Sequence, residues 1–269
     1  MRVAVVGHVE WVEFLRVDRV PQPGDIVQVH ETWAEAAGGG ADAAVQLAKL
    51  AGSSQLFTAL GDDELGHRAF EQLRRQGVRV EAAWRAEPQR RAFCYIDLTG
   101  ERTITLLSPK LVARRCDSLP WDELAETDGV YFTGGDPAAL QAARSARILV
   151  ATARELPTLR AAGVELDVLV ASAADRGERY DEGSIDPRPR FVVRTEGAEG
   201  GTVEPGGRFA AAQVPGPFSD AYGAGDAFAA GLTFGLARGS KIGDALDLAA
   251  RCGAAVLTGR GPYEAQLSL

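Results

Sequence analysis

The sequence predicts an α/β protein with a doubly wound, mainly parallel β-sheet flanked by helices, and a second, smaller β-sheet. Apolar runs typical of buried strands alternate with helical segments over most of the chain, beginning with residues 2–7. Two other stretches, 10–35 and 91–107, alternate apolar and polar residues, which is typical of strands with one face in water. A length of 269 residues fits one large unit. We therefore expect a single domain over residues 1–269, with the alternating strands inserted in it.

The composition limits the class of protein. Hydrophobic residues make up 46% of the chain and aromatic residues 7%, which predicts a globular core built mostly from Ala, Val and Leu. With 29 basic and 37 acidic side chains the net charge is −8, so we expect no binding to nucleic acid or to an anionic membrane, because both need a basic surface. Three widely spaced cysteines indicate neither a disulfide framework nor a zinc site. Without a secretion signal or a long apolar window, the sequence predicts a cytoplasmic protein.

The remaining elements follow from periodicity. Apolar runs predict buried strands, and apolar residues at helical spacing predict helices. The predicted strands are residues 54–60, 129–134, 146–153, 164–172, 190–197 and short ones near 202–213. The predicted helices are residues 38–52, 61–78, 136–144, 224–238 and 240–258, the last with Ser240 as its N-cap. The strands within 10–35 and 91–107 share one pattern, so we expect them to pair into a small sheet apart from the main one.

Two glycine-rich segments, 38–40 and 223–225, each lead into a predicted helix. A helix N-terminus offers unpaired N–H donors and a partial positive charge, and glycines let an anion approach the backbone. For any single loop of this kind a tight turn is the more common explanation. The dinucleotide spacing G-x-G-x-x-G fails after Gly7, and the phosphate-loop pattern G-x-x-x-x-G-K-[ST] is absent. A Rossmann dehydrogenase and a P-loop NTPase are therefore disfavoured.

Asp226 stands in the first turn of the helix predicted after Gly223, Ala224 and Gly225. The helix N-terminus is expected to lower its pKa and to keep the carboxylate ionised at neutral pH. The amides beside it could receive a transferring phosphoryl group, a reaction that needs positioning and charge stabilisation more than a strong base. An isolated Asp at this position more often only stabilises its helix.

Four blocks, which occur in the same order, resemble the ribokinase-like (PfkB-type) carbohydrate kinases. The segment DAYGAGDAFAAGL (220–232) resembles the family signature D-T-x-G-A-G-D-x-F-x-A-G, with Ala221 in place of Thr. GGGADAAVQLAKLAG (38–52), followed by ALGDDELG, is similar to the N-terminal signature of the family. TGERTITLL (99–107) is similar to its G-E-R-T hairpin, and VVRTEGAEGG (192–201) to its nucleotide-side strand and turn.

This resemblance implies a phosphotransferase that moves the γ-phosphate of ATP to a hydroxyl of a sugar or related alcohol, on a ribokinase-like fold whose small sheet is a lid. It implies that Asp226 is the general base and that the amides of 223–225 form an anion hole. The implied sugar-side residues are Gly38, Gly39 and Asp42, and the implied nucleotide-side residues are Thr195, Gly197 and Gly200. Asp220 matches a position associated with a monovalent cation in some members. Mg²⁺ is expected to accompany the ATP phosphates, because it keeps waters and uses few protein ligands.

The chain departs from the family pattern at several site positions. Asp42 replaces the Asn of G-A-N, and an acid donates a hydrogen bond only when protonated, so we expect it to read a different hydroxyl pattern. Glu10 is the only acceptor where ribokinases carry N-x-D, and we expect it to bind substrate. The N-x-x-E motif that helps to organise phosphate and Mg²⁺ appears only as Ser172 and Asp175. Each departure is also compatible with drift within a working kinase.

Two alternatives to a sugar kinase stay open. A nucleoside kinase of the same fold is favoured if Trp11 or Trp33 stacks on a base. A non-catalytic ligand-binding or regulatory protein is the other, because the motif changes and Ala221 affect the catalytic blocks. The same two tryptophans could instead lie in a homodimer interface through the lid, or pack on the lid's own underside.

Overall fold

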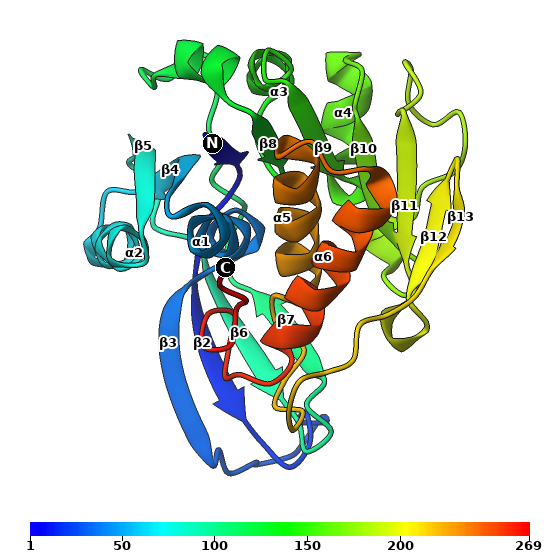
Figure 1. The fold of residues 1–269 in the computed structure, drawn as a ribbon. Coiled ribbons are helices and arrows are strands. Elements are labelled where there is room, and N and C mark those ends of the chain that lie inside the picture. Colours follow the sequence, from blue (N-terminus) through cyan, green and yellow to red (C-terminus); the bar gives the residue numbers. More distant parts are fainter.

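The computed structural model describes residues 1–269, and its strands form two separate sheets (Figure 1). The strands of the larger sheet are β1 (Val3–Val6), β4 (Ser54–Gly61), β5 (Val78–Arg85), β8 (Gly129–Phe132), β9 (Ile148–Thr152), β10 (Val168–Ser172), β11 (Phe191–Thr195), β12 (Gly201–Glu204) and β13 (Gly207–Phe209). Their order across the sheet is β13-β12-β11-β10-β9-β8-β1-β4-β5. The strands from β11 to β5 are all parallel, and β12 and β13 add an antiparallel edge. The predicted doubly wound, mainly parallel sheet is confirmed.

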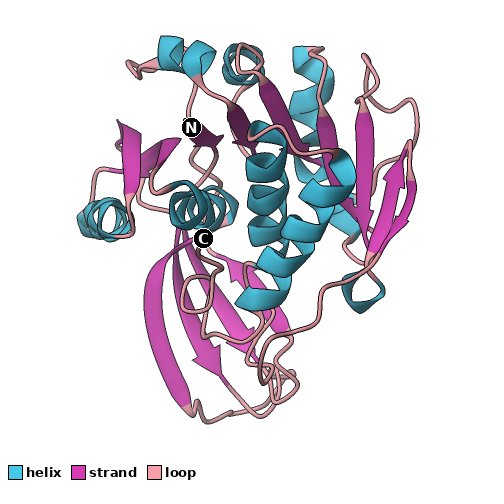
Figure 2. Ribbon diagram, viewed as in Figure 1, coloured by secondary structure: helices cyan, strands magenta, loops and turns pink.

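Helices cover both faces of this sheet (Figure 2). The helices are α1 (Gly39–Ala51), α2 (Glu64–Arg75), α3 (Pro137–Ala143), α4 (Leu156–Ala162), α5 (Ala224–Ala237) and α6 (Ile242–Val256). Side chains of α1, α2, α5 and α6 share one buried cluster, and side chains of α3, α4 and a 3-10 helix at Trp121–Glu126 share another.

The central strand β1 shows why two such clusters form. Val3 and Val5 belong to the first cluster, whereas Ala4 and Val6 belong to the second. Successive side chains of a strand point to opposite faces, so a strand buried on both faces must be apolar throughout. The unbroken apolar run at the start of the sequence is the direct result.

The smaller sheet, which we call the lid, lies at one end of the main sheet (Figure 1). It consists of β2 (Glu10–Arg16), β3 (Glu31–Ala37), β6 (Arg91–Ile96) and β7 (Arg102–Leu106), in the order β3-β2-β6-β7. The two hairpins are joined by parallel pairing of β2 with β6, in which Trp11 lies opposite Arg91 and Arg16 opposite Ile96. The pairing predicted between strands far apart in the sequence is confirmed.

The structure corrects some local predictions. Helix α6 begins at Ile242 with Lys241 as N-cap, and the Ser240 hydroxyl instead accepts a hydrogen bond from Arg238 Nε at 2.9 Å. Strand β5, which has mixed burial, and helix α4 were not predicted. None of the helices combines the length and apolar composition that crossing a membrane would require.

Candidate active site

The site is built where the first turn of α1 meets the end of β1. The Gly40 N–H donates to the His8 carbonyl at 3.1 Å. A β-carbon on Gly40 would lie 2.6 Å from both the Gly7 carbonyl carbon and the His8 carbonyl oxygen. Only glycine allows the helix to begin this close to the strand.

The first turn of α5 contains the three residues expected to form an anion hole, and its backbone is open at Gly225. Gly223 is the N-cap, with a φ of 78° that favours glycine, and the helix begins at Ala224. A β-carbon on Gly225 would meet no atom within 4 Å, so this end of the helix has space beside its backbone. Unpaired N–H groups with free space beside them fit a phosphate group.

Asp226 lies in the first turn of α5 and faces the start of α1. A β-carbon on Gly39 would come within 2.9 Å of Asp226 Oδ1 and within 2.7 Å of Thr133 Oγ1. The carboxylate therefore lies against the glycine loop of the predicted sugar side.

The pKa of Asp226 is raised to about 6, first by burial and then by the negative charge of Glu178. The positive charges of His8, Arg102 and Arg154 oppose this increase. The expectation that the helix N-terminus would lower the pKa was wrong, because the loss of hydration outweighs the helix dipole. The carboxylate is still mostly ionised at neutral pH, and a pKa just below the working pH suits a general base.

Glu10, the first residue of β2, is an ionised acid within a buried charged group. Its Oε1 lies 3.3 Å from His8 Nε2 and 3.1 Å from Arg90 Nε, and all three residues are buried. Burial alone would raise the pKa of Glu10, but His8, Arg90 and Lys110 together bring it below its ordinary value. The Glu10 Cγ also lies 3.1 Å from the position of a β-carbon on Gly38.

Asp42, in the first turn of α1, is only 1% exposed. Its Oδ1 has no hydrogen-bond partner, and its Oδ2 lies 3.6 Å from the position of a β-carbon on Gly223. Burial, followed by the charges of Asp226, Glu35 and Glu10, holds the pKa of Asp42 well above its ordinary value. The structure thus brings Glu10, Asp42 and Asp226 together around the two glycine loops.

The nucleotide-side residues lie at the carboxyl ends of β10 and β11. Ser172 and Thr195 are the last residues of these strands and lie opposite each other in the sheet. Gly197 and Gly200 follow in a tight turn with φ values of 59° and 80°. Ligands of open α/β sheets bind at this edge.

The two predicted metal residues are already engaged by protein groups. Asp175 pairs with Arg154 and accepts the Gly177 N–H at 2.8 Å. Asp220 is fully buried; its Oδ1 accepts the Tyr222 N–H and its Oδ2 the Gly261 N–H, each at 3.0 Å. No group of three or more His, Cys, Asp or Glu residues is arranged to hold a metal ion.

A positive side chain already lies beside Asp220, the position expected to accompany a monovalent cation. Arg16 NH2 lies 3.8 Å from Asp220 Oδ2, so the chain supplies its own positive charge there. Burial keeps the pKa of Asp220 above its ordinary value, although its two backbone donors and the charge of Arg16 oppose the increase.

Several residues of the site were not assigned a role from the sequence. Glu178 lies in a short 3-10 helix (Arg176–Glu178), where Arg154 Nε donates to its Oε1 at 3.1 Å, and its charge reaches Asp226. Thr133 follows β8, and its carbonyl oxygen lies 3.3 Å from His8 Nδ1. The only sequence signal that could have assigned Thr133 to the site is its position directly after a buried strand.

The two lid tryptophans pack within the chain. Trp11 is 5% exposed and lies under the Arg68 guanidinium, 4.6 Å from the ring centroid. Trp33 stacks on Phe14 with ring centroids 4.8 Å apart and an interplanar angle of 5°. Within the single chain, Trp11 is therefore buried, and Trp33, which is half-buried, has one face covered by Phe14.

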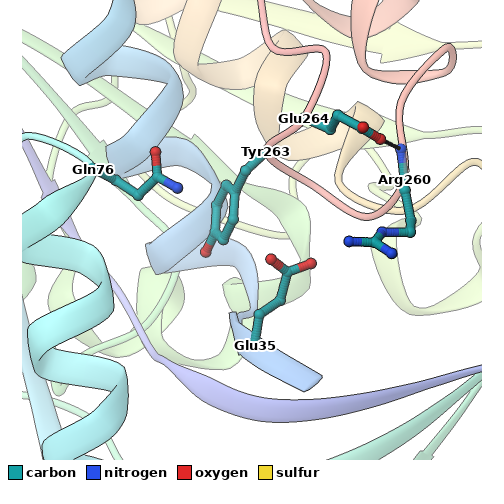
Figure 3. Close-up of a pocket in the computed structure, with 5 residues that line it drawn as sticks. All are labelled: Glu35, Gln76, Arg260, Tyr263 and Glu264. Carbon is teal, nitrogen blue, oxygen red and sulfur yellow. Dashed lines mark hydrogen bonds between the residues drawn. The ribbon is translucent and has the colours of Figure 1, made fainter. Parts of the chain in front are cut away.

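A polar pocket of about 210 Å³ lies beside the site, with Glu35 between Tyr263 and Arg260 (Figure 3). Gln76 and Glu264 complete its lining. Burial raises the pKa of Glu35 to about 7. None of the residues predicted to bind substrate or nucleotide lines this pocket.

Comparison with known proteins decides the family. The model of the pfkB family carbohydrate kinases matches residues 1–158 and 184–268. The chain belongs to this family of carbohydrate kinases. The segment that the family model does not match, 159–183, contains Ser172, Asp175 and Glu178, where the kinase motif departs from its usual form.

Individual relatives of this carbohydrate kinase agree with the assignment. It is 29% identical to an ATP-dependent ribose-1-phosphate kinase of Halopiger xanaduensis, an alignment that covers 94% of this chain and 91% of the relative. Its fold is similar to that of a Cryptococcus neoformans ribokinase solved in complex with ADP, with a TM-score of 0.78, 23% identity and coverage of 100% and 97% of the two chains. A Thermotoga maritima ribokinase gives a TM-score of 0.77 at 20% identity, with coverage of 100% and 96%.

Proposed function

We propose that this carbohydrate kinase transfers the γ-phosphate of ATP to a hydroxyl of a sugar or sugar-like substrate. The substrate oxygen attacks the γ-phosphorus, the bond to the β–γ bridging oxygen breaks, and the hydroxyl proton passes to Asp226. The observation that carries the proposal is the open first turn of α5, with Asp226 in it and with Glu10 and Asp42 facing the same loops.

The amides of Gly223, Ala224 and Gly225 are proposed to stabilise the charge that builds on the transferring group. Such donors act strongly because they are fixed in place before the reaction. Gly38, Gly39, Asp42 and Glu10 are proposed to bind the sugar.

The nucleotide is proposed to bind along the ends of β10 and β11, beside Ser172, Thr195, Gly197 and Gly200. Mg²⁺ bound to the ATP phosphates would neutralise their charge. No acidic cluster for a protein-held ion exists here, so the Mg²⁺ site is expected to consist mainly of phosphates and water.

A coupled assay of ADP release tests this function on a panel of sugars, sugar phosphates and nucleosides. The similarity to a ribose-1-phosphate kinase makes ribose 1-phosphate the first compound to assay. We expect at least one sugar or sugar phosphate to give turnover that Asp226→Asn lowers about 10²- to 10⁴-fold, the usual contribution of a general base.

Asp244→Asn is the matched control, because Asp244 is also an acid in the first turn of a helix but is exposed on α6. We expect it to keep full activity. If no compound gives turnover above that of Asp226→Asn while ligands still raise the melting temperature, the chain is a binding protein and the kinase proposal fails.

We also propose a cytoplasmic homodimer formed through the lid. Strand β7 is exposed along its whole length, and Ile104, Leu106 and Leu107 are 41%, 53% and 46% exposed on it and just after it. Exposed apolar patches of this kind often mark protein interfaces. Sedimentation equilibrium of wild type beside Ile104→Lys/Leu106→Lys tests the proposal, which fails if both proteins are monomeric.

A further inference from the structure

Asp42 is a buried acid without a positive partner, unlike Glu10 and Asp220. Glu10 contacts His8 and Arg90, and Asp220 accepts two backbone N–H groups. Asp42 forms no ion pair, its Oδ1 is a buried oxygen without a donor, and the neighbouring Tyr263 hydroxyl only partly opposes the rise of its pKa. An ionised carboxylate in such a position would cost several kcal/mol, by general estimates for buried charges.

The titratable groups that face Asp42 carry negative charge or none. They come from each element packed against it: Asp226 on α5, Glu35 on β3, Glu10 on β2, Cys94 on β6, Tyr222 before α5 and Tyr263 near the C-terminus. The nearest lysine on its own helix, Lys49, donates to the Tyr263 carbonyl instead.

We propose that Asp42 is held as a neutral carboxylic acid at neutral pH and donates a hydrogen bond to a hydroxyl of the substrate. The inference rests on the sugar-kinase function proposed above. A neutral carboxyl group presents one O–H donor and one carbonyl acceptor, the same pair that a side-chain amide presents. Asp42 could then form the same hydrogen bonds to substrate hydroxyl groups as the Asn usual at this position, contrary to the expectation from the sequence.

The direction of both acidic pKa values agrees with this. Burial and three neighbouring carboxylates keep the pKa of Asp42 high, whereas the charged neighbour that raises the pKa of Asp226 is Glu178. Asp226 therefore ionises beside an Asp42 that keeps its proton. Oδ1 is shut off from solvent without a partner, which favours the neutral carboxyl, and Oδ2, which lies towards Gly223, is the oxygen left for a substrate hydroxyl.

Urea unfolding of wild type and Asp42→Asn between pH 4 and 8 tests the protonation state without any substrate. An unfolded Asp releases its proton above a pH of about 4, whereas the folded protein retains it. The equilibrium constant for unfolding of wild type should therefore rise, relative to that of Asp42→Asn, by up to tenfold per pH unit. The rise ends when the pH reaches the pKa of Asp42 in the folded protein. We expect the Asn variant to become progressively more stable than wild type as the pH rises.

Glu10→Gln is the matched control, because Glu10 is a buried acid of the same site whose pKa is lowered. Its contribution to stability is present above the unfolded pKa and is lost on acidification. The Gln variant should therefore be less stable than wild type at neutral pH, by a margin that shrinks towards pH 4. The proposal is overturned if the stability of Asp42→Asn relative to wild type falls as the pH rises, as expected for Glu10→Gln. It is also overturned if the difference in the free energy of unfolding does not depend on pH.

A second measurement covers an Asn variant that does not fold. The infrared spectrum of wild type at pH 7 should contain the carbonyl stretch of a protonated carboxylic acid that is missing from Asp42→Ser. Because Glu35, with a pKa of about 7, contributes a band of this type to both proteins, the difference spectrum is the readout, and identical bands in wild type and Asp42→Ser also overturn the proposal.

The hydrogen-bonding role is tested on any compound that passes the kinase assay. We expect Asp42→Asn to keep kcat/KM within about tenfold, and Asp42→Ala to lose at least about a hundredfold, mainly through KM, because it leaves a polar substrate group unpaired. Equal losses in both variants would contradict donation by Asp42. If no compound is turned over, the unfolding data still decide the protonation state, so failure of the function and of this inference are distinguishable.

Discussion

The Asp226 carboxylate lies against the backbone of Gly39, with Oδ1 2.9 Å from the position that a β-carbon on Gly39 would occupy. The first turns of α5 and α1 therefore meet at Asp226, the proposed proton acceptor. Gly39, in the N-terminal quarter of the chain, thus limits the position of the Asp226 side chain, in the C-terminal quarter.

Gly39→Ala is expected to displace this carboxylate. The added methyl group would meet Asp226 Oδ1 and also Thr133 Oγ1, at 2.7 Å. Displacing a catalytic group by about 1 Å can cost about a hundredfold in rate, so we expect kcat to fall at least that far. The clash should also lower the free energy of unfolding by about 1–3 kcal/mol. Steady-state kinetics and urea unfolding measure the two effects.

Gly243→Ala provides the control for this substitution. Gly243 lies in the first turn of α6, and its β-carbon would meet no atom within 4 Å. Activity should be unchanged, because helix positions with free space favour alanine over glycine. A Gly39→Ala enzyme with wild-type kcat would contradict the placement of Asp226.

The acid limb of the pH profile should report Asp226. Its pKa is raised to about 6, and only the ionised form accepts the substrate proton, so kcat/KM should fall below a pH of about 6. Glu178 contributes a negative charge to that increase, so Glu178→Gln should move the midpoint to lower pH. The exposed Glu182→Gln, whose carboxylate pairs with Arg188, serves as control and should leave the midpoint in place.

Activity should not depend on the identity of the monovalent cation. Arg16 lies 3.8 Å from Asp220 and supplies positive charge where an ion would otherwise bind. Rates in sodium, potassium and tetramethylammonium chloride at equal ionic strength should agree. Arg16→Met should lower the rate in tetramethylammonium and let potassium restore part of it. Strong activation of the wild type by potassium would show that Arg16 does not replace a monovalent cation beside Asp220.

The buried ion pair between Arg90 and Glu10 should be important for stability. Arg90 is 6% exposed, and its removal would leave Glu10 buried with His8 as its remaining partner. We expect Arg90→Met to lower the free energy of unfolding by about 3–5 kcal/mol, as for other broken buried pairs. Arg19→Met breaks an exposed pair with Asp25 and should change it little. Urea unfolding of the two variants gives the comparison.

The main features of the fold could be predicted from the sequence because burial leaves a clear pattern. Apolar runs marked the strands buried on both faces, and alternation marked the lid strands, whose register is set by one buried face. The two glycine loops also marked the starts of α1 and α5, because each needs a left-handed or closely packed backbone.

The electrostatics of the site could not be predicted in this way. The helix position of Asp226 suggested a lowered pKa, but Glu178 and the burial of the site reverse it, and neither follows from the local sequence. The same holds for Asp42, because the groups that raise its pKa come from other parts of the chain. Arg16 and Asp220 are 204 positions apart, and only the folded chain brings them together.

The lid is assembled from two separate stretches of chain, 10–37 and 91–106, that meet along the parallel pairing of β2 with β6. Neither stretch can form the four-stranded sheet alone, so a single protease cut would not release the lid as a fragment. Anyone exchanging lids between relatives to alter substrate preference would need to graft both stretches together. A chimaera that carries only one would present mismatched side chains along the seam.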